Sequence, residues 1–155
     1  MNRKIVTGLL LLFLTITGMY AQQDSSCIMG TWKLISLKHN EKEIKLAQED
    51  SVLRLKFITQ SSFVWIQYLK RNKIIRNSVG GTYTLKGTDY VENINFVGVG
   101  LIESLGASNA FKVKIVDNKM YLSGKLSTGM IIDEIWQRTD KEMIKNKDLT
   151  MSGLK

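Results

Sequence analysis

The 155-residue sequence contains no proline, a single cysteine, Cys27, and a single histidine, His39. One cysteine cannot form an intramolecular disulfide, so the core alone must hold the fold. One cysteine and one histidine also cannot assemble a zinc site of the usual kind. Cys27 has no obvious partner base, and His39 begins a polar stretch that we expect to be a solvated loop. The sequence therefore predicts no metal site, no cofactor and no thiol nucleophile.

Only one long apolar run occurs, and it is too short to span a bilayer. It extends from Ile5 to Ile16 after the basic start Asn2-Arg3-Lys4, and a further short stretch ends at Ala21. This layout is typical of a secretory signal, whereas a membrane anchor needs about 20 apolar residues. We therefore expect cleavage after Ala21, a periplasmic or secreted protein, and no transmembrane span in the mature chain. Lipid attachment at Cys27 is less favoured, because the residues before it are polar.

Acidic residues are few relative to basic ones, 14 against 22, which gives a net charge of +8. Cleavage would remove two basic residues, Arg3 and Lys4, and leave a length that suits one domain with one core. The remaining basic excess could favour anionic partners such as membrane surfaces or acidic glycans, but a solvated outer strand face explains it more simply. No basic patch with interleaved aromatic residues is present, so nucleic acid is not a predicted partner.

Long amphipathic helices are also missing from the pattern, and alternating apolar and polar positions dominate instead. This alternation predicts about eight short strands, and up to ten, near residues 30–36, 53–57, 63–69, 82–86, 90–96, 111–115, 119–125 and 130–138. We expect the apolar face of each strand to form the inner wall. Gly80-Gly81 should interrupt the chain, and a short helix is expected within residues 101–105.

Such a series of strands predicts an all-β fold, an antiparallel up-and-down barrel. Closure removes the exposed sheet edges, and eight strands leave room for one small ligand. The expected organisation is a signal peptide at 1–21, a short linker at 22–29, the barrel at 30–139 and a charged tail at 140–155.

The first and last strands carry a pair of residues that resembles the lipocalin signature. Gly30-x-Trp32 lies on the first strand, and Arg138 lies near the end of the last. The resemblance implies that Trp32 closes one end of the barrel while Arg138 packs across its ring, a plausible cation–π contact. Gly30 would allow the chain to pass close beneath that ring. These three are the predicted barrel-closing residues.

A longer series of segments resembles the lipocalin-like (calycin) envelope proteins of anaerobic Gram-negative bacteria. The resemblance covers nearly the whole mature chain up to Arg138. Because that group has no assigned activity, it implies a fold and a compartment rather than a chemistry. The segments are Gly30-Thr31-Trp32-Lys33-Leu34, Phe63-Val64-Trp65-Ile66-Gln67, Gly80-Gly81-Thr82-Tyr83-Thr84-Leu85, Tyr90-Val91-Glu92, Ser104-Leu105-Gly106, Lys119-Met120-Tyr121-Leu122-Ser123-Gly124 and Glu134-Ile135-Trp136-Gln137-Arg138.

Two carboxylates, Glu92 and Glu134, share strand faces with large apolar residues and are therefore expected inside the barrel. An unpaired buried carboxylate must find a partner or take up a proton. One hypothesis makes both groups polar anchors for a ligand; the other lets them satisfy each other, or pair with Arg138, and only specify the fold. We expect Glu92→Gln to alter ligand uptake while the barrel still folds. The predicted ligand-binding residues are Trp65, Gln67, Tyr83, Tyr90, Glu92, Glu134 and Trp136.

The sequence thus favours an exported barrel that binds a small apolar or amphipathic molecule, with the connections at 39–50 and 97–110 as candidate lids. An alternative is an interaction module with a solid core that binds a protein or glycan. It is suggested by Val64, Ile66 and Tyr68, an apolar stripe on an outer strand face. A hydrolase with Glu92 and Glu134 as acid and base is a third possibility. No motif supports it, so no catalytic residue is predicted.

Overall fold

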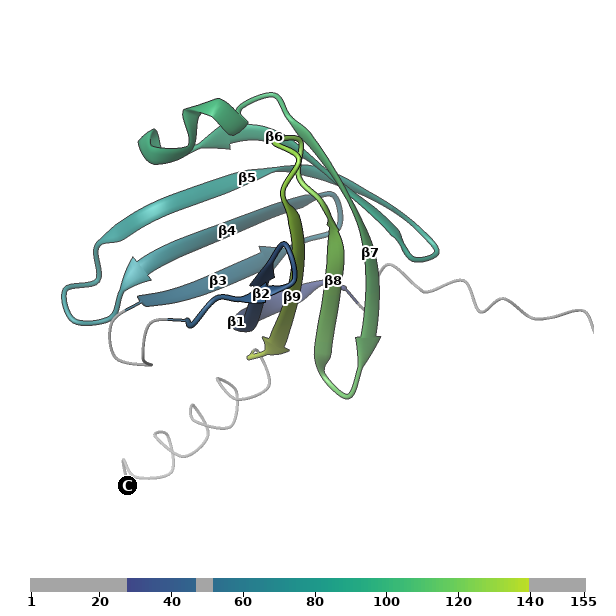
Figure 1. Ribbon diagram of the computed structural model, residues 1–155, viewed down its shortest axis with the longest axis horizontal. Coiled ribbons are helices and arrows are strands. Elements are labelled where there is room, and N and C mark those ends of the chain that lie inside the picture. Colours follow the sequence, from purple (N-terminus) through teal and green to yellow (C-terminus); the bar gives the residue numbers. More distant parts are fainter. Residues whose placement is uncertain (1–27, 47–51, 140–155) are drawn as a thin grey trace, which may run out of the picture.

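The computed structural model describes residues 28–46 and 52–139, and these form one antiparallel sheet with a single short helix (Figure 1). The expected signal peptide, most of the linker and the tail lie outside the described residues. The elements are β1 (Gly30–His39), β2 (Lys42–Glu43), β3 (Val52–Ile58), β4 (Ser62–Leu69), β5 (Ile75–Lys86), β6 (Asp89–Val97), the 3-10 helix η2 (Val99–Ser104), β7 (Ser108–Val116), β8 (Lys119–Lys125) and β9 (Ile131–Arg138).

The sheet closes on itself, because β1 pairs with β9 as well as with β3. The β1–β9 ladder runs from Trp32 opposite Arg138 to His39 opposite Ile132. From β3 onward each strand pairs with its successor in the chain, and the short β2 is attached only to the end of β1. The predicted eight-stranded up-and-down barrel is therefore confirmed, with one additional short strand. The short helix expected within residues 101–105 is also present, as η2 at Val99–Ser104.

In an up-and-down barrel the connections alternate between the two ends. The segment after β1, the β4–β5 turn, η2 and the β8–β9 turn therefore lie at one end, which we call the open end. The β3–β4, β5–β6 and β7–β8 turns lie at the other, together with the start of β1. We call this second end the closed end. Within the described ranges, no helix is both long and apolar enough to cross a membrane.

A tryptophan and an arginine plug the closed end. The Trp32 ring is fully buried, and the Arg138 guanidinium lies 4.1 Å from its centroid. Arg138 Nη1 also donates a hydrogen bond to the Met29 carbonyl at 2.6 Å. The Trp32 indole N–H donates to the carbonyl of Ile28, a fully buried residue that the sequence had placed in the linker. The contact implied by the lipocalin resemblance is therefore present, and Gly30 supports it with a φ of +133°, which favours glycine.

The glycine pair in β5 does not interrupt the strand, so the predicted break at Gly80-Gly81 was wrong. β5 continues from Ile75 to Lys86, with only a register shift against β6 between the two glycines. A Cβ atom on Gly81 would lie 1.9 Å from the Asn93 carbonyl oxygen. The missing side chain lets the neighbouring backbone approach, and the irregularity is of the kind that bends a strand around a barrel.

β3 faces the opposite way from the sequence expectation that apolar faces form the inner wall. Lys56 is buried, with only 2% of its surface exposed, whereas the alternating Phe57 is 38% exposed. The register explains this, since Lys56 lies opposite Trp65 and Ile58 lies opposite Phe63. Residues directly opposite each other in neighbouring strands project from the same face. The inward position of Phe63 and Trp65 therefore places the basic side of β3 inside the barrel.

The buried hydrophobic residues pack the closed half of the barrel and continue along the walls of its open half. The largest hydrophobic side chains among them, Trp32, Trp136, Tyr90 and Phe63, are aromatic. The buried hydrophobic residues are Ile28, Trp32, Leu34, Leu37, Ile58, Phe63, Val79, Tyr83, Tyr90, Ile94, Phe111, Val113, Met120, Leu122, Ile132 and Trp136.

Arg138→Ala is expected to lower the free energy of unfolding by about 2 kcal/mol, because it removes a cation–π contact and a charged hydrogen bond at once. Urea unfolding measures the change. Lys114→Ala, which truncates an exposed basic residue on β7, is the control and should have almost no effect. Equal urea midpoints for the two variants would contradict a stabilising role for Arg138.

Candidate functional site

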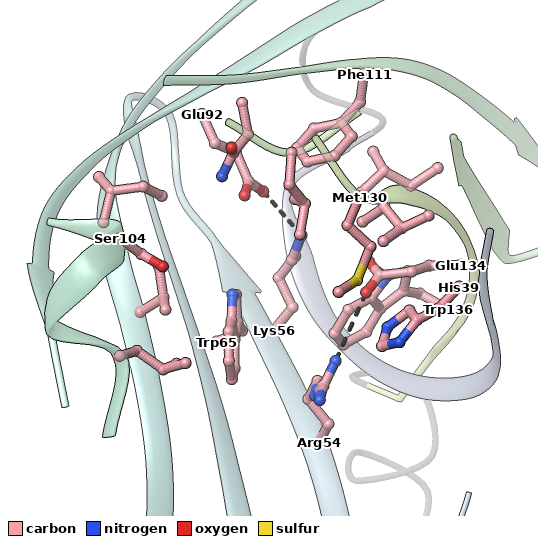
Figure 2. Close-up of a pocket in the computed structure, with 17 residues that line it drawn as sticks. His39, Arg54, Lys56, Trp65, Glu92, Ser104, Phe111, Met130, Glu134 and Trp136 are labelled. Carbon is pink, nitrogen blue, oxygen red and sulfur yellow. Dashed lines mark hydrogen bonds and ion pairs between the residues drawn. The ribbon is translucent and has the colours of Figure 1, made fainter. Parts of the chain in front are cut away.

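A cavity of about 230 Å³ occupies the barrel interior on the open side of the packed core (Figure 2). Its lining reaches η2 and the β8–β9 turn, so it extends toward the open end. Most of the wall is apolar, from Trp65, Val79, Ile94, Leu101, Phe111, Leu122, Leu126, Met130, Ile132 and Trp136. The polar lining residues are His39, Arg54, Lys56, Ser104, Glu92, Asn109 and Glu134.

The deepest polar feature is an ion pair between Lys56 of β3 and Glu92 of β6. Lys56 Nζ donates to Glu92 Oε1 at 2.8 Å, and both residues are at least 97% buried. The ammonium group also lies 4.9 Å from the centroid of the Trp136 ring, and the rings of Phe63 and Tyr90 lie within 6 Å. Burial disfavours both charges, but the carboxylate and the aromatic faces compensate the cation.

A second, looser ion pair lies nearer the open end. Arg54 Nη1 is 3.6 Å from Glu134 Oε1, while the Trp136 indole N–H donates to Glu134 Oε2 at 2.9 Å. The guanidinium also lies 4.8 Å from the Trp65 ring centroid and donates a long hydrogen bond of 3.4 Å to Gln67. Burial lowers the pKa of Arg54 from its usual value, and the charge of Glu134 opposes that effect.

Arg54 has hydrogen-bonding capacity that this arrangement uses weakly. Its Nε is buried and has no hydrogen-bond partner within the part of the chain that the structure describes. Its contacts with Glu134 and Gln67, at 3.6 and 3.4 Å, are both longer than an optimal charged hydrogen bond of about 2.7–2.9 Å. Arg54 is therefore the cavity side chain most able to gain from a polar group on a bound molecule.

Four of the seven predicted ligand-binding residues line the cavity, namely Trp65, Glu92, Glu134 and Trp136. Gln67 does not line it, but its Oε1 accepts hydrogen bonds from Arg54 and from Asn77.

The two predicted tyrosines lie in the packed core and not in the cavity wall. Tyr83 donates through its hydroxyl to the Thr59 carbonyl at 2.7 Å, which holds it toward the closed end. Tyr90 is fully buried, with its ring 5.3 Å from that of Tyr83 and 6.3 Å from that of Phe111. Neither tyrosine lines the cavity, and the contacts of both rings are with the packed core and the β3–β4 turn.

Sequence reasoning missed both cations and misplaced the histidine. Arg54 and Lys56 alternate with apolar residues that looked like the inner face, so they were read as outward. Two inward carboxylates required inward partners, and that requirement could have identified these two basic residues. His39 was expected in a solvated loop, but it ends β1 as a half-buried residue and lines the cavity.

The described residues hold no group of three or more histidine, cysteine, aspartate or glutamate side chains arranged to bind a metal ion. The carboxylates of the cavity are instead engaged by cations. The arrangement can therefore enclose a small molecule between apolar walls and offer it charged groups of both signs.

Comparisons with known proteins find distant structural likenesses only. No protein-family model matches the sequence, and no curated protein matches it. One similar solved structure, the REP1-NXSQ fatty acid transporter, is 12% identical, with 75% of this chain and 98% of that chain covered and a TM-score of 0.41. A mutant of the fluorescent protein UnaG is also 12% identical, with 73% and 96% covered and a TM-score of 0.40. The strand order itself shows a closed antiparallel up-and-down barrel, which is consistent with the lipocalin-like fold class predicted from the sequence.

Glu92→Gln is now expected to destabilise the barrel, contrary to the expectation from sequence, because it leaves Lys56 charged and buried without its carboxylate. Breaking a buried pair in this way costs about 3–5 kcal/mol. Urea unfolding should show this loss, whereas the double variant Lys56→Met with Glu92→Leu should recover most of it. A single variant as stable as the wild type would show that the pair does not hold the interior together.

Tyr90→Phe is expected to change stability at pH 7 by less than about 1 kcal/mol, because the buried Tyr90 hydroxyl makes no hydrogen bond of normal geometry among the described residues and its neighbour Glu92 already accepts one from Lys56. Burial, followed by the charge of Glu92, raises the pKa of Tyr90 well above its usual value of 10.0. In the unfolded chain the phenol ionises near that usual value. The stability that this shift contributes is therefore present below about pH 10 and is lost as the pH rises further.

Urea unfolding at pH 7 and at about pH 10.5 measures this effect. Tyr90→Phe should lose less stability between the two pH values than the wild type, and Tyr121→Phe, at an exposed tyrosine, should match the wild type. Equal alkaline losses in all three proteins would contradict the assignment.

Proposed function

We propose that this chain is an exported lipocalin-like protein that binds a small, partly apolar molecule inside its barrel. The observation that carries the proposal is the cavity of about 230 Å³ that remains beside a tightly packed core. A barrel whose interior is purely structural becomes more stable when side chains fill such space, because a void removes van der Waals contacts. Here the space is kept, and four charged side chains border it.

The cavity dimensions restrict the ligand. Sites for small molecules usually enclose about 300–1,000 Å³, so a cavity of about 230 Å³ suits a molecule at the small end of this range. Its apolar part would contact Val79, Ile94 and Leu122, while a polar group would contact Arg54. The short Lys56–Glu92 pair is already satisfied and would serve mainly to hold the wall in place.

Export and an envelope location belong to the same proposal. They are supported by the basic start, short apolar run and cleavage site within residues 1–21, and by the resemblance of the strand segments to Gram-negative envelope proteins. We propose no enzymatic activity, because Glu92 and Glu134, the candidate acid and base, are each engaged by a cation.

A second function, as an interaction module, is favoured by the outer surface of β3 and β4. Val64, Ile66 and Tyr68 on β4 lie opposite Phe57, Leu55 and Leu53 on β3. Because opposite residues share a face, the apolar stripe seen in the sequence is twice as wide as expected. Such a surface could bind a partner protein or glycan whether or not the cavity is occupied.

Native mass spectrometry and dye displacement test the cavity proposal. Protein purified from cells should carry a small molecule, and its intact mass should correspond to a chain beginning at Gln22. An apolar fluorescent dye should bind the emptied protein and be displaced by small amphipathic molecules. Leu126→Trp, which enlarges a side chain of the cavity wall near the open end, should weaken dye binding at least about tenfold through steric exclusion.

The matched control is Val116→Trp, which adds the same side chain at an exposed position of the closed end. It should leave dye affinity unchanged. No co-purified molecule and equal dye binding by both variants would contradict the cavity proposal. If the dye binds only to the outer surface of the barrel, the Leu55→Ser variant should lose this binding. That result would favour the interaction module.

A further inference from the structure

Exposed apolar side chains gather at the open end of the barrel. Among the described residues, nine of the fourteen exposed large hydrophobic residues belong to its connections and strand ends. Single exposed apolar residues are ordinary, but a concentration around one opening indicates an interaction surface. The nine residues are Ile44, Leu46, Ile74, Ile75, Val99, Ile102, Leu105, Met130 and Ile131.

The β4–β5 hairpin, residues 70–76, combines two of these apolar residues with a concentrated positive charge. Ile74 and Ile75 are 53% and 55% exposed. The same seven residues include four basic side chains and no acidic one. The basic members are Lys70, Arg71, Lys73 and Arg76.

Hydrogen bonds hold this hairpin in a defined shape. The Leu69 N–H donates to the Ile74 carbonyl at 3.0 Å, and the Lys73 N–H donates to the Leu69 carbonyl at 2.9 Å. The Asn72 side chain accepts from the Ile74 N–H at 3.2 Å. The turn therefore presents its isoleucines to solvent instead of folding them against the barrel.

The helix η2 extends the same rim. Its first residue, Val99, is 88% exposed, and Ile102 and Leu105 are also exposed. The Gly98 N–H donates to the Ser78 carbonyl at 2.8 Å, which anchors the start of η2 beside β5. Figure 1 shows η2 and the β4–β5 hairpin projecting at the same end of the sheet. The only acidic residue within η2 is Glu103.

We propose that the open end docks on an anionic lipid surface. The hairpin cations would lie among the headgroups, and the apolar side chains of the hairpin and η2 would enter the boundary with the acyl chains. Basic residues near an anionic membrane each strengthen binding about fivefold. The described rim residues carry seven basic side chains, Lys42, Lys45, Lys70, Arg71, Lys73, Arg76 and Lys125, against three acidic ones, Glu41, Glu43 and Glu103.

A lipid surface fits this rim better than a protein partner does. The apolar side chains stand at the ends of separate connections that surround the cavity, and basic residues are interspersed among them. Projecting tips of this kind can enter a bilayer together, because lipids rearrange around each of them. Docking would also place the cavity against the membrane, so an amphipathic ligand could pass between them without crossing water. This last consequence rests on the proposed function, whereas docking itself does not.

Vesicle flotation tests the docking proposal. The full chain should float with vesicles of phosphatidylglycerol and phosphatidylcholine at low salt, float less at high salt, and stay unbound with pure phosphatidylcholine. Arg71→Glu with Lys73→Glu should weaken binding at least about tenfold. Ile74→Ser with Ile75→Ser should weaken it without changing the net charge.

The matched control is Lys86→Glu with Lys114→Glu, which changes the net charge by the same amount at exposed positions away from the open end. It should bind vesicles nearly as well as the wild type. Equal losses for this control and the hairpin charge variant would overturn the proposal, as would a wild type that never floats. Circular dichroism confirms that each variant is folded, and dye binding to the cavity, measured separately, shows whether the ligand site persists.

Discussion

Lys56 and Glu92 meet inside the barrel, with 2.8 Å between Nζ and Oε1 and almost no exposure of either side chain. Neither charge is tolerable there without the other, because an isolated ion in a low-dielectric interior costs several kcal/mol. The pair joins two strands, β3 and β6, that are not neighbours in the sheet. It therefore constrains which face of β3 turns inward, and the rest of the interior is arranged around that choice.

The two halves of the barrel on either side of the Lys56–Glu92 pair differ in how completely side chains fill the interior. Toward the closed end, Trp32, Tyr83 and Tyr90 fill the space with rings, and the Arg138 guanidinium covers the outermost of them. Toward the open end the wall is mostly apolar, but two ion pairs, Lys56–Glu92 and Arg54–Glu134, project from it into the interior. Each charged group is held by its partner, and a cavity remains beside the two pairs. The cavity lies where aromatic packing gives way to paired charges.

Much of this architecture could be predicted from the sequence, because its signals are local. Alternation revealed the strands, and the Trp32 and Arg138 positions indicated closure. Glu92 and Glu134 were expected inside if the strand faces that they share with large apolar residues point inward, and both side chains are buried. The side of β3 that faces inward could not be read in this way, since one face carries leucines and phenylalanine and the other carries two basic residues. Only the register with β4, which places Lys56 opposite Trp65, decides it.

Two features that seem unrelated follow from that one register. With Arg54 and Lys56 inside, Leu55 and Phe57 must project outward, because successive side chains of a strand alternate between faces. The same pairing that gives Glu92 and Glu134 their cations therefore also creates the apolar surface on the outside of β3 and β4. A slip of β3 by one residue would reverse both effects: the β3 half of the outer stripe would enter the interior, and the two carboxylates would lose their partners. The cost of those unpaired carboxylates holds the strand in register, so the exposed stripe can persist as a consequence of the charged cavity even if it binds no partner.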